Sequence, residues 1–198
     1  MKKYELTSET KVVFGRTLHR IRALISFGNV EAGELGGWVE KEENLDHFGD
    51  AWVSGNAQVF GDARVYGDAW VYGDAQVSGN ARVSGNAQVF GDARVSGNAR
   101  VYGNAQVFGD AQVSGNARVC NDEEWMVFGP AGSRNDFTTF FACADGSIGV
   151  KCGCFYGNLD DFAKKVQATH GDNDHAKIYK AAIEVAKLRI RVGEVNVQ

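Results

Sequence analysis

The chain has 198 residues, of which 44% are apolar, and its formal net charge at pH 7 is −4. This small negative charge gives no general attraction to nucleic acid, and the chain has no apolar run long enough to cross a membrane. Glycine is abundant, with 25 residues against a single proline, and most of these glycines recur at a fixed period. Periodic glycine indicates an ordered repeat rather than a flexible segment.

Residues 1–50 precede the regular repeat and are predicted to form an irregular lead-in. The opening "MKKYELTSET" is charged and polar where a secretory signal would be apolar, so we expect the protein in the cytoplasm. Counting back from Ala51 in steps of six reaches Leu45, Val39 and Gly33, which are apolar or small. We therefore expect one degenerate coil ahead of the regular ones.

Residues 51–120 carry a repeat of six residues. Ala stands at every sixth position from Ala51 to Ala117, and Val follows each Ala by two residues. Strand alternation places Ala and Val on one face with the polar residue between them on the other, and a Gly-Asn or Gly-Asp pair then bends the chain. A hairpin meander would have strands too short for stable pairing, whereas in stacked coils each short strand pairs with the coils on either side. The repeat therefore predicts a solenoid.

The pattern V-x-G-[DN]-A-x resembles the hexapeptide repeat of left-handed parallel β-helices, in which three hexads form a triangular coil of about 18 residues. The lead-in "GRTLHRIRALISFGNVEAGELGGWVEKEENL" is similar to the start of hexapeptide-repeat proteins carried by phages and prophages. The resemblance implies a mainly β fold, with Val and Ala inside the prism, and a homotrimer.

Positions 18 residues apart stack in such a prism and form columns. One outward column consists of Arg64, Arg82, Arg100 and Arg118, and the corner residues near it are mostly uncharged. Stacked guanidinium groups repel one another unless something screens them. Three arrangements would relieve this repulsion. The arginines could be solvated on a free surface, they could pair with acids from a neighbouring subunit, or their guanidinium groups could bind a phosphate-bearing ligand through paired N–H donors.

A corner column of aromatic residues, Tyr72, Phe90 and Phe108, runs beside Asp74, Asp92 and Asp110. Outward rings in such a column would form a sticky patch in isolation. We expect them to pack against a neighbouring subunit or a flanking helix rather than against a ligand.

The positions of the histidines bear on whether the protein is an enzyme. Acyltransferases and γ-class carbonic anhydrases share the predicted fold, but their chemistry needs histidine as a general base or as a zinc ligand. The repeat contains none, and of the four histidines, His19, His47, His170 and His175, only His47 lies at the edge of the coils. The sequence therefore favours binding over catalysis and predicts no cofactor.

Residues 121–198 are predicted to form a small α+β module. In "DFTTFFACADGSIGVKCGCF", Asp145-Gly146 is a hairpin turn signal. A turn at these two residues would put Phe137, Thr139, Phe141 and Cys143 on one face with Ile148, Val150, Cys152 and Cys154. Among such neighbours cysteine behaves as a small buried hydrophobe, and the alternative is a zinc site completed by His170.

Two helices are expected after this hairpin. The first begins after Asn158 as its N-cap and ends at Gly171, and the second spans about 174–191. Ahead of the hairpin, Gly132-Ser133-Arg134-Asn135 resembles an anion-binding loop, for which an ordinary turn is the alternative. The histidines His170 and His175 flank "GDND", either as a solvated inter-helix loop or near a ligand.

The resemblance to phage-type proteins, which are often counter-defence factors, and the unbalanced arginine column together lead to a hypothesis. The protein is expected to be a trimeric binding protein that sequesters a phosphorylated small molecule, such as a nucleotide second messenger. The predicted ligand residues are Arg64, Arg82, Arg100, Arg118, Ser133, Arg134, Asn135 and His170. The alternatives are a scaffold whose tail recognises a host protein, and an acyltransferase that uses His47. We expect neither a metal nor a membrane partner.

Overall fold

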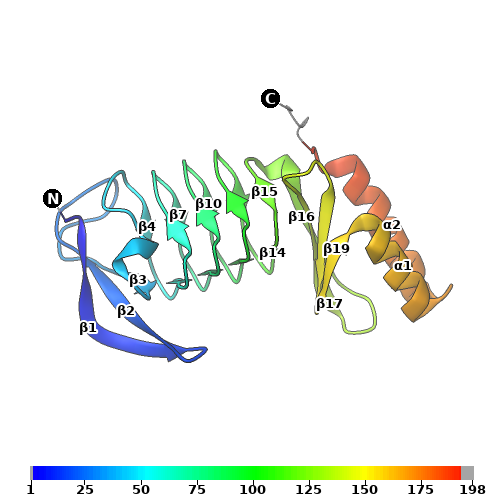
Figure 1. Ribbon diagram of the computed structural model, residues 1–198, viewed down its shortest axis with the longest axis horizontal. Coiled ribbons are helices and arrows are strands. Elements are labelled where there is room, and N and C mark those ends of the chain that lie inside the picture. Colours follow the sequence, from blue (N-terminus) through cyan, green and yellow to red (C-terminus); the bar gives the residue numbers. More distant parts are fainter. Residues whose placement is uncertain (1, 193–198) are drawn as a thin grey trace.

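The computed structural model describes residues 2–192, which form an elongated molecule (Figure 1). An N-terminal β-hairpin lies at one end, a solenoid of parallel strands forms the middle, and a unit of strands and two helices closes the other end. No helix within this range is long and apolar enough to cross a membrane.

The lead-in is regular, contrary to the prediction. Strands β1 (Tyr4–Val13) and β2 (Arg16–Ala23) form a long antiparallel hairpin, and β2 pairs with β3 (Leu35–Val39). The hairpin turns at Phe14 and Gly15, which both have positive φ values, 50° and 75°. A turn of this kind is usually marked by Asn-Gly, and a phenylalanine in the left-handed region gives no such signal.

The degenerate coil exists, but its phase differs from the prediction by two residues. Val39 pairs with Val59 and Leu45 with Val65, so Leu45 occupies a valine position and not the alanine position that counting from Ala51 assigned. The short helix η1 (Glu42–Asn44) lies between these two pairings. The chain between Leu45 and Ala51 is two residues longer than a regular corner requires, which restores the phase of the repeat.

The regular solenoid consists of two-residue strands stacked in three parallel arrays, β5-β8-β11-β14, β4-β7-β10-β13 and β6-β9-β12-β15, and the first of these continues from the longer strand β3. Their bounds are β4 (Trp52–Val53), β5 (Gln58–Val59), β6 (Arg64–Val65), β7 (Trp70–Val71), β8 (Gln76–Val77), β9 (Arg82–Val83), β10 (Gln88–Val89), β11 (Arg94–Val95), β12 (Arg100–Val101), β13 (Gln106–Val107), β14 (Gln112–Val113) and β15 (Arg118–Val119). Backbone bonds link the coils: the nitrogen of Arg82, for example, donates to the oxygen of Ala99 at 2.9 Å.

The interior of the solenoid contains the alanine and valine of every hexad, all with 0% exposure. Burial of each valine stabilises the fold by about 1.5 to 3 kcal/mol. The chain bends at corner glycines such as Gly97, whose φ of +68° is a conformation that only glycine adopts without strain. A Cβ atom on Gly97 would lie 2.8 Å from the backbone nitrogen of Gly115 in the next coil, so the coil spacing also requires glycine here.

The two ends of the solenoid are closed by side chains of opposite chemistry. In bonds such as the one from Arg82 to Ala99 the N–H group points toward the C-terminal end, so at the corresponding positions the first coil has unpaired carbonyls and the last has unpaired N–H groups. Lys3 Nζ donates to the oxygens of Gly49 and Ala51, and Asn44 Nδ2 donates to those of Gly61 and Ala63. At the other end, the N–H groups donate to Asp122 Oδ1, Thr139 Oγ1 and the Tyr156 hydroxyl.

The C-terminal unit begins with η2 (Asp122–Glu124) and contains an antiparallel sheet in the order β16 (Trp125–Ala131), β17 (Asp136–Ala142), β18 (Ile148–Cys152) and β19 (Phe155–Asn158). Helices α1 (Leu159–His170) and α2 (Asp174–Arg189) follow, and Asn158 and Gly171 cap α1 as predicted. The second helix ends two residues before the expected boundary. One face of the sheet packs on the last coil and the other on the helices.

The predicted hairpin register in this unit is wrong. Ala142 pairs with Ile148, and the connection is a five-residue loop in which the Cys143 nitrogen donates to the Ser147 oxygen at 2.9 Å. Thr138, Phe140 and Ala142 therefore share the helix-facing side with Ile148, Val150 and Cys152. Phe141 and Cys143 contact the solenoid instead, so Cys143 and Cys152 lie on opposite faces of the sheet.

Candidate ligand-binding site

The four column arginines each begin a strand of the sheet β6-β9-β12-β15. Arg82 pairs in register with Arg64 and with Arg100, and Arg100 pairs with Arg118. Because each arginine precedes an inward valine, strand alternation turns its side chain outward, and all four are exposed. The hexad spacing therefore produces the stacked column that the sequence predicts.

Three of these arginines line a groove of about 300 Å³, which we call the arginine groove. Its lining consists of Arg82, Arg100, Arg118, Tyr66, Ser84 and Tyr102. The three hydroxyl residues belong to the corner that directly follows the arginine strands. Arg64 lies outside the groove and lines a separate pocket with Lys41, Glu43 and Asp62.

The arginine column has no acidic partner within residues 2–192, where the ion pairs all involve other residues. Asp62, the acid nearest to Arg64 in the repeat, pairs with Lys41 at 2.8 Å. The corners that border the arginine sheet carry Asp62 and Asp68 in the first coil and bonded amides in the next two, from Asn80 to Asn98 and from Asn86 to Asn104. The carboxylates Asp74, Asp92 and Asp110 follow the strands β7, β10 and β13, at the corner opposite this sheet. Arg82 and Arg100 are therefore bordered by uncharged amides on both sides of their sheet.

A second cavity, of about 190 Å³, brings together three residues that the sequence analysis singled out: Ser133, Arg134 and His170. Its lining is completed by Cys152, Cys154, Phe155, Phe162, Lys165, Val166, Thr169 and Tyr179. The loop between β16 and β17 supplies Ser133 and Arg134, and the end of α1 supplies His170. The charged side chains of Arg134 and Lys165 thus line the same cavity as apolar side chains such as Phe155 and Phe162. Asn135, with a φ of 49°, shapes the loop and does not line this cavity.

Two glycines permit the close approaches that shape this cavity. A Cβ on Gly153 would clash with the Arg134 guanidinium, and a Cβ on Gly132 would clash with the Tyr179 hydroxyl. Both glycines have positive φ values, which are strained for any other residue. The position of Arg134 over the cavity therefore depends on a backbone without a side chain at Gly153.

Tyr179 supplies a neutral hydroxyl to the second cavity. Burial, together with the nearby Cys152 thiol, raises the pKa of Tyr179 to about 12. Its hydroxyl lies 3.8 Å from Cys152 Sγ, and the His170 ring stacks on the Tyr179 ring with centroids 5.9 Å apart. Neutral donors and two cations suit an anion with a small apolar portion.

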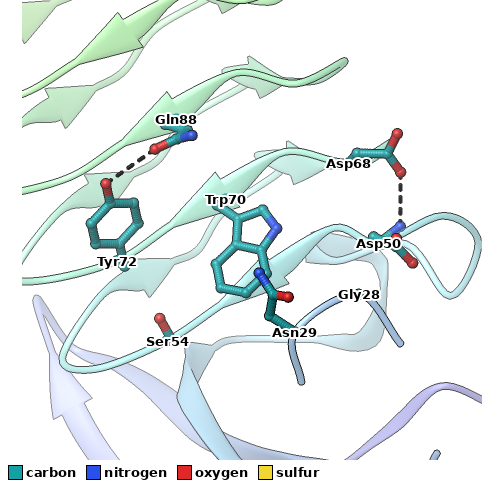
Figure 2. A pocket seen from close by; sticks show the side chains of 8 residues that line it. All are labelled: Gly28, Asn29, Asp50, Ser54, Asp68, Trp70, Tyr72 and Gln88. Atoms are coloured by element: carbon teal, nitrogen blue, oxygen red, sulfur yellow. Dashed lines mark hydrogen bonds between the residues drawn. The ribbon is translucent and has the colours of Figure 1, made fainter. Parts of the chain in front are cut away.

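A third cavity, of about 520 Å³, lies between the lead-in and the sheet of β4, β7, β10 and β13 (Figure 2). Trp70 forms a wall, Asp50 and Asp68 stand on one side, and on the other the Tyr72 hydroxyl donates to Gln88 Oε1 at 3.1 Å. Sequence reasoning missed this cavity because Gly28 and Asn29 of the lead-in complete it. The outward position of Trp70 was the only signal for it in the repeat.

His47, the residue on which the acyltransferase alternative rested, belongs to the N-terminal end of the solenoid. Its ring stacks on the Tyr4 ring with centroids 4.4 Å apart, and its Nδ1 accepts a hydrogen bond from the backbone nitrogen of Lys3 at 3.2 Å. Burial lowers the pKa of His47. These contacts give His47 a packing role. Across the part of the chain that the structure describes, His, Cys, Asp and Glu form no group of three or more suited to a metal ion.

Comparison with known families finds a similarity in the repeat. Segments 57–73, 75–91, 87–103, 93–109 and 111–122 match the family described as YdcK Beta solenoid repeat. Among the curated proteins, none matches the chain. The matched segments all lie within the solenoid and its first following residues, so this similarity supports the β-solenoid fold.

Proposed function

We propose that this protein is a non-catalytic binding protein that holds a phosphorylated small molecule in the arginine groove. The observation that carries the proposal is the alignment of Arg82, Arg100 and Arg118 in one groove without an acidic partner among the described residues. A guanidinium group binds phosphate through two parallel hydrogen bonds, and a phosphate between two stacked arginines also removes their repulsion. The cost of stacking these charges is then offset only when the ligand is bound.

The oligomeric state, location and biological role that we propose rest on the resemblance of the repeat and the lead-in to hexapeptide-repeat proteins of phages. The protein acts as a homotrimer in the cytoplasm, as a phage-type counter-defence factor that sequesters a nucleotide second messenger. The exposed edge of Phe108, at 44% exposure, and the stacked rings beside it provide an apolar surface for subunit contact.

Native mass spectrometry of the purified protein and calorimetric titration with ADP test the proposal. The double variant Arg82→Glu/Arg100→Glu should bind ADP at least about tenfold more weakly, because charged hydrogen bonds are lost and repulsion is added. The matched control is Arg94→Glu, since Arg94 begins β11 in the same hexad position but belongs to the neighbouring sheet, between Gln76 and Gln112. Equal affinity of the wild type and the double variant, or no binding by either, would overturn the proposal.

A second candidate function is protein recognition by the C-terminal unit. Helix α2 exposes Ile178, Val185 and Leu188, and the exposed fraction of Leu188 reaches 82%. Apolar side chains on one stretch of a surface helix suit a protein partner. Val185→Glu/Leu188→Glu in the full chain should abolish capture of a host protein and leave ADP binding unchanged.

A further inference from the structure

Two corners of the solenoid carry aromatic columns of different completeness. At the corner that follows β7, β10 and β13, Tyr72, Phe90 and Phe108 form a continuous stack. The centroids of Tyr72 and Phe90 lie 4.9 Å apart with an interplanar angle of 3°, and those of Phe90 and Phe108 lie 5.2 Å apart at 17°. One ring per coil therefore fills a corner column with near-parallel rings.

At the corner that follows the arginine strands, the middle ring is missing. The equivalent residues are Tyr66, Ser84 and Tyr102, so a serine stands where the other corner has Phe90. Tyr66 and Tyr102 are two coils apart, which corresponds to about 9.6 Å at the strand spacing of a sheet. The complete column accommodates one ring between its first and third members across the same two coils. The gap above Ser84 therefore has the depth of a single planar ring.

The gap opens directly onto the arginine groove. The residues Tyr66, Ser84 and Tyr102 line the same groove as the arginines Arg82, Arg100 and Arg118. Arg82 and Arg100 begin the strands that lead into this corner, and Arg118 continues their column. A planar group in the gap thus has guanidinium donors beside it. The neighbouring corner amides, Asn86 and Asn104, are bonded to each other through one donor and one acceptor, which leaves an amide oxygen on Asn86 and N–H donors on Asn104 for a ligand.

We propose that the Tyr66–Ser84–Tyr102 gap is a base-binding slot for a nucleotide whose phosphates lie in the arginine groove. Its base takes the place of the missing ring between Tyr66 and Tyr102, and its phosphates contact Arg82, Arg100 and Arg118. Stacking on aromatic rings accepts any base, because every base has a π-face. This inference rests on the proposed function, and it adds a subsite to it: the slot binds the base, so a nucleotide is preferred over a sugar phosphate.

The decisive variant is Ser84→Phe, which supplies the missing ring from the protein itself. The corner tolerates this residue type, since Phe90 occupies the equivalent position of the next corner along the chain. The control is Ser96→Phe, at the corner between β11 and β12, which does not line the groove. Circular dichroism and native mass spectrometry establish that both variants fold and assemble as the wild type does.

Calorimetric titrations with ADP, GDP and ribose 5-phosphate measure whether the slot adds affinity for a base. The wild type should bind each nucleotide at least tenfold more tightly than ribose 5-phosphate. Ser84→Phe should lower the affinity for both nucleotides to about that for ribose 5-phosphate and so remove this preference, and Ser96→Phe should keep it. A folded Ser84→Phe variant that retains the preference would overturn the slot.

The same titrations separate failure of the slot from failure of the proposed function. Equal binding of nucleotides and ribose 5-phosphate by the wild type, lost in Arg82→Glu/Arg100→Glu, would overturn the slot and leave the phosphate site standing. Absence of binding to all three probes would overturn both.

Discussion

The Thr139 hydroxyl accepts a hydrogen bond from the backbone nitrogen of Gln112 at 2.8 Å, and it joins the C-terminal unit to the last coil of the solenoid. Thr139 is 1% exposed, so the bond is shielded from water. Gln112 lies in β14, the last strand of its sheet, where no further coil follows to accept its N–H. A side-chain oxygen from β17 therefore replaces the carbonyl of a missing coil.

Replacement of this hydroxyl should destabilise the junction. Thr139→Val keeps the shape of the side chain but leaves the Gln112 N–H unsatisfied, which should lower the free energy of unfolding by about 1 to 3 kcal/mol. Thr139→Ser retains the acceptor and should cost less. Urea unfolding followed by circular dichroism measures both, and equal stability of the valine variant and the wild type would contradict the capping role.

Two glycines in the same repeat position should differ in their tolerance of alanine. Gly97 and Gly109 both have positive φ values, +68° and +62°, but a Cβ on Gly97 would meet the next coil at 2.8 Å, whereas a Cβ on Gly109 has open space around it. Gly109→Ala should cost about 1 to 2 kcal/mol from the backbone conformation alone. Gly97→Ala should cost distinctly more in the same unfolding assay, and the reverse order would refute the close coil contact.

Lys3 should make the stability of the protein depend on alkaline pH. Burial lowers the pKa of Lys3 from 10.5 to about 8, although Asp46, Asp50 and Asp68 act in the opposite direction. Between pH 8 and pH 10.5 the unfolded chain binds a proton at Lys3 that the folded protein does not. The contribution of Lys3 to the free energy of unfolding therefore rises with pH across this range, and it is lost as the pH falls to about 8.

The comparison with Lys3→Met isolates this effect. The stability difference in favour of the wild type should be larger at pH 10 than at pH 7 in urea unfolding, because other titrating groups are common to both proteins. A difference that shrinks toward pH 10 would show that Lys3 is charged in the folded state throughout this range.

The cysteines should differ in reactivity toward iodoacetamide. Cys154 is exposed at the rim of the second cavity, whereas burial raises the pKa values of Cys120 and Cys143. Since the thiolate is the reactive form, Cys154 should be alkylated first, and Cys154→Ser should remove the fast phase. Peptide mapping by mass spectrometry identifies the modified residue, and earlier labelling of Cys120 or Cys143 would contradict the arrangement.

The solenoid could be predicted from the sequence because one local rule, repeated without error, determines both the strand faces and the stacking. The same spacing is enough to place Arg82 above Arg100. The hairpin after Asp136 could not be placed by such a rule, because its five-residue loop is closed by a bond between Cys143 and Ser147 that the Asp-Gly signal does not reveal. A one-residue change of register then reverses the faces of the strand.

The candidate sites show the same division. The arginine column follows from spacing, and Ser133 with Arg134 was marked by loop composition. The convergence of His170 on that loop depends on how α1 packs against the sheet, which the sequence does not encode locally. The gap at Ser84 appears in the repeat as a single small residue, but its relation to Tyr66 and Tyr102 becomes visible only when the other corner shows how rings stack.

The side chains at the two solenoid ends also cover the edges through which stacked coils could extend from one molecule to the next. A bare stack of coils would present a row of acceptors at one end and a row of donors at the other, so one molecule could continue the stack of the next and grow into a filament. The ammonium group of Lys3 and the amide of Asn44 occupy the first row, and Asp122, Thr139 and Tyr156 occupy the second. These side chains therefore occupy the backbone groups that head-to-tail growth would need.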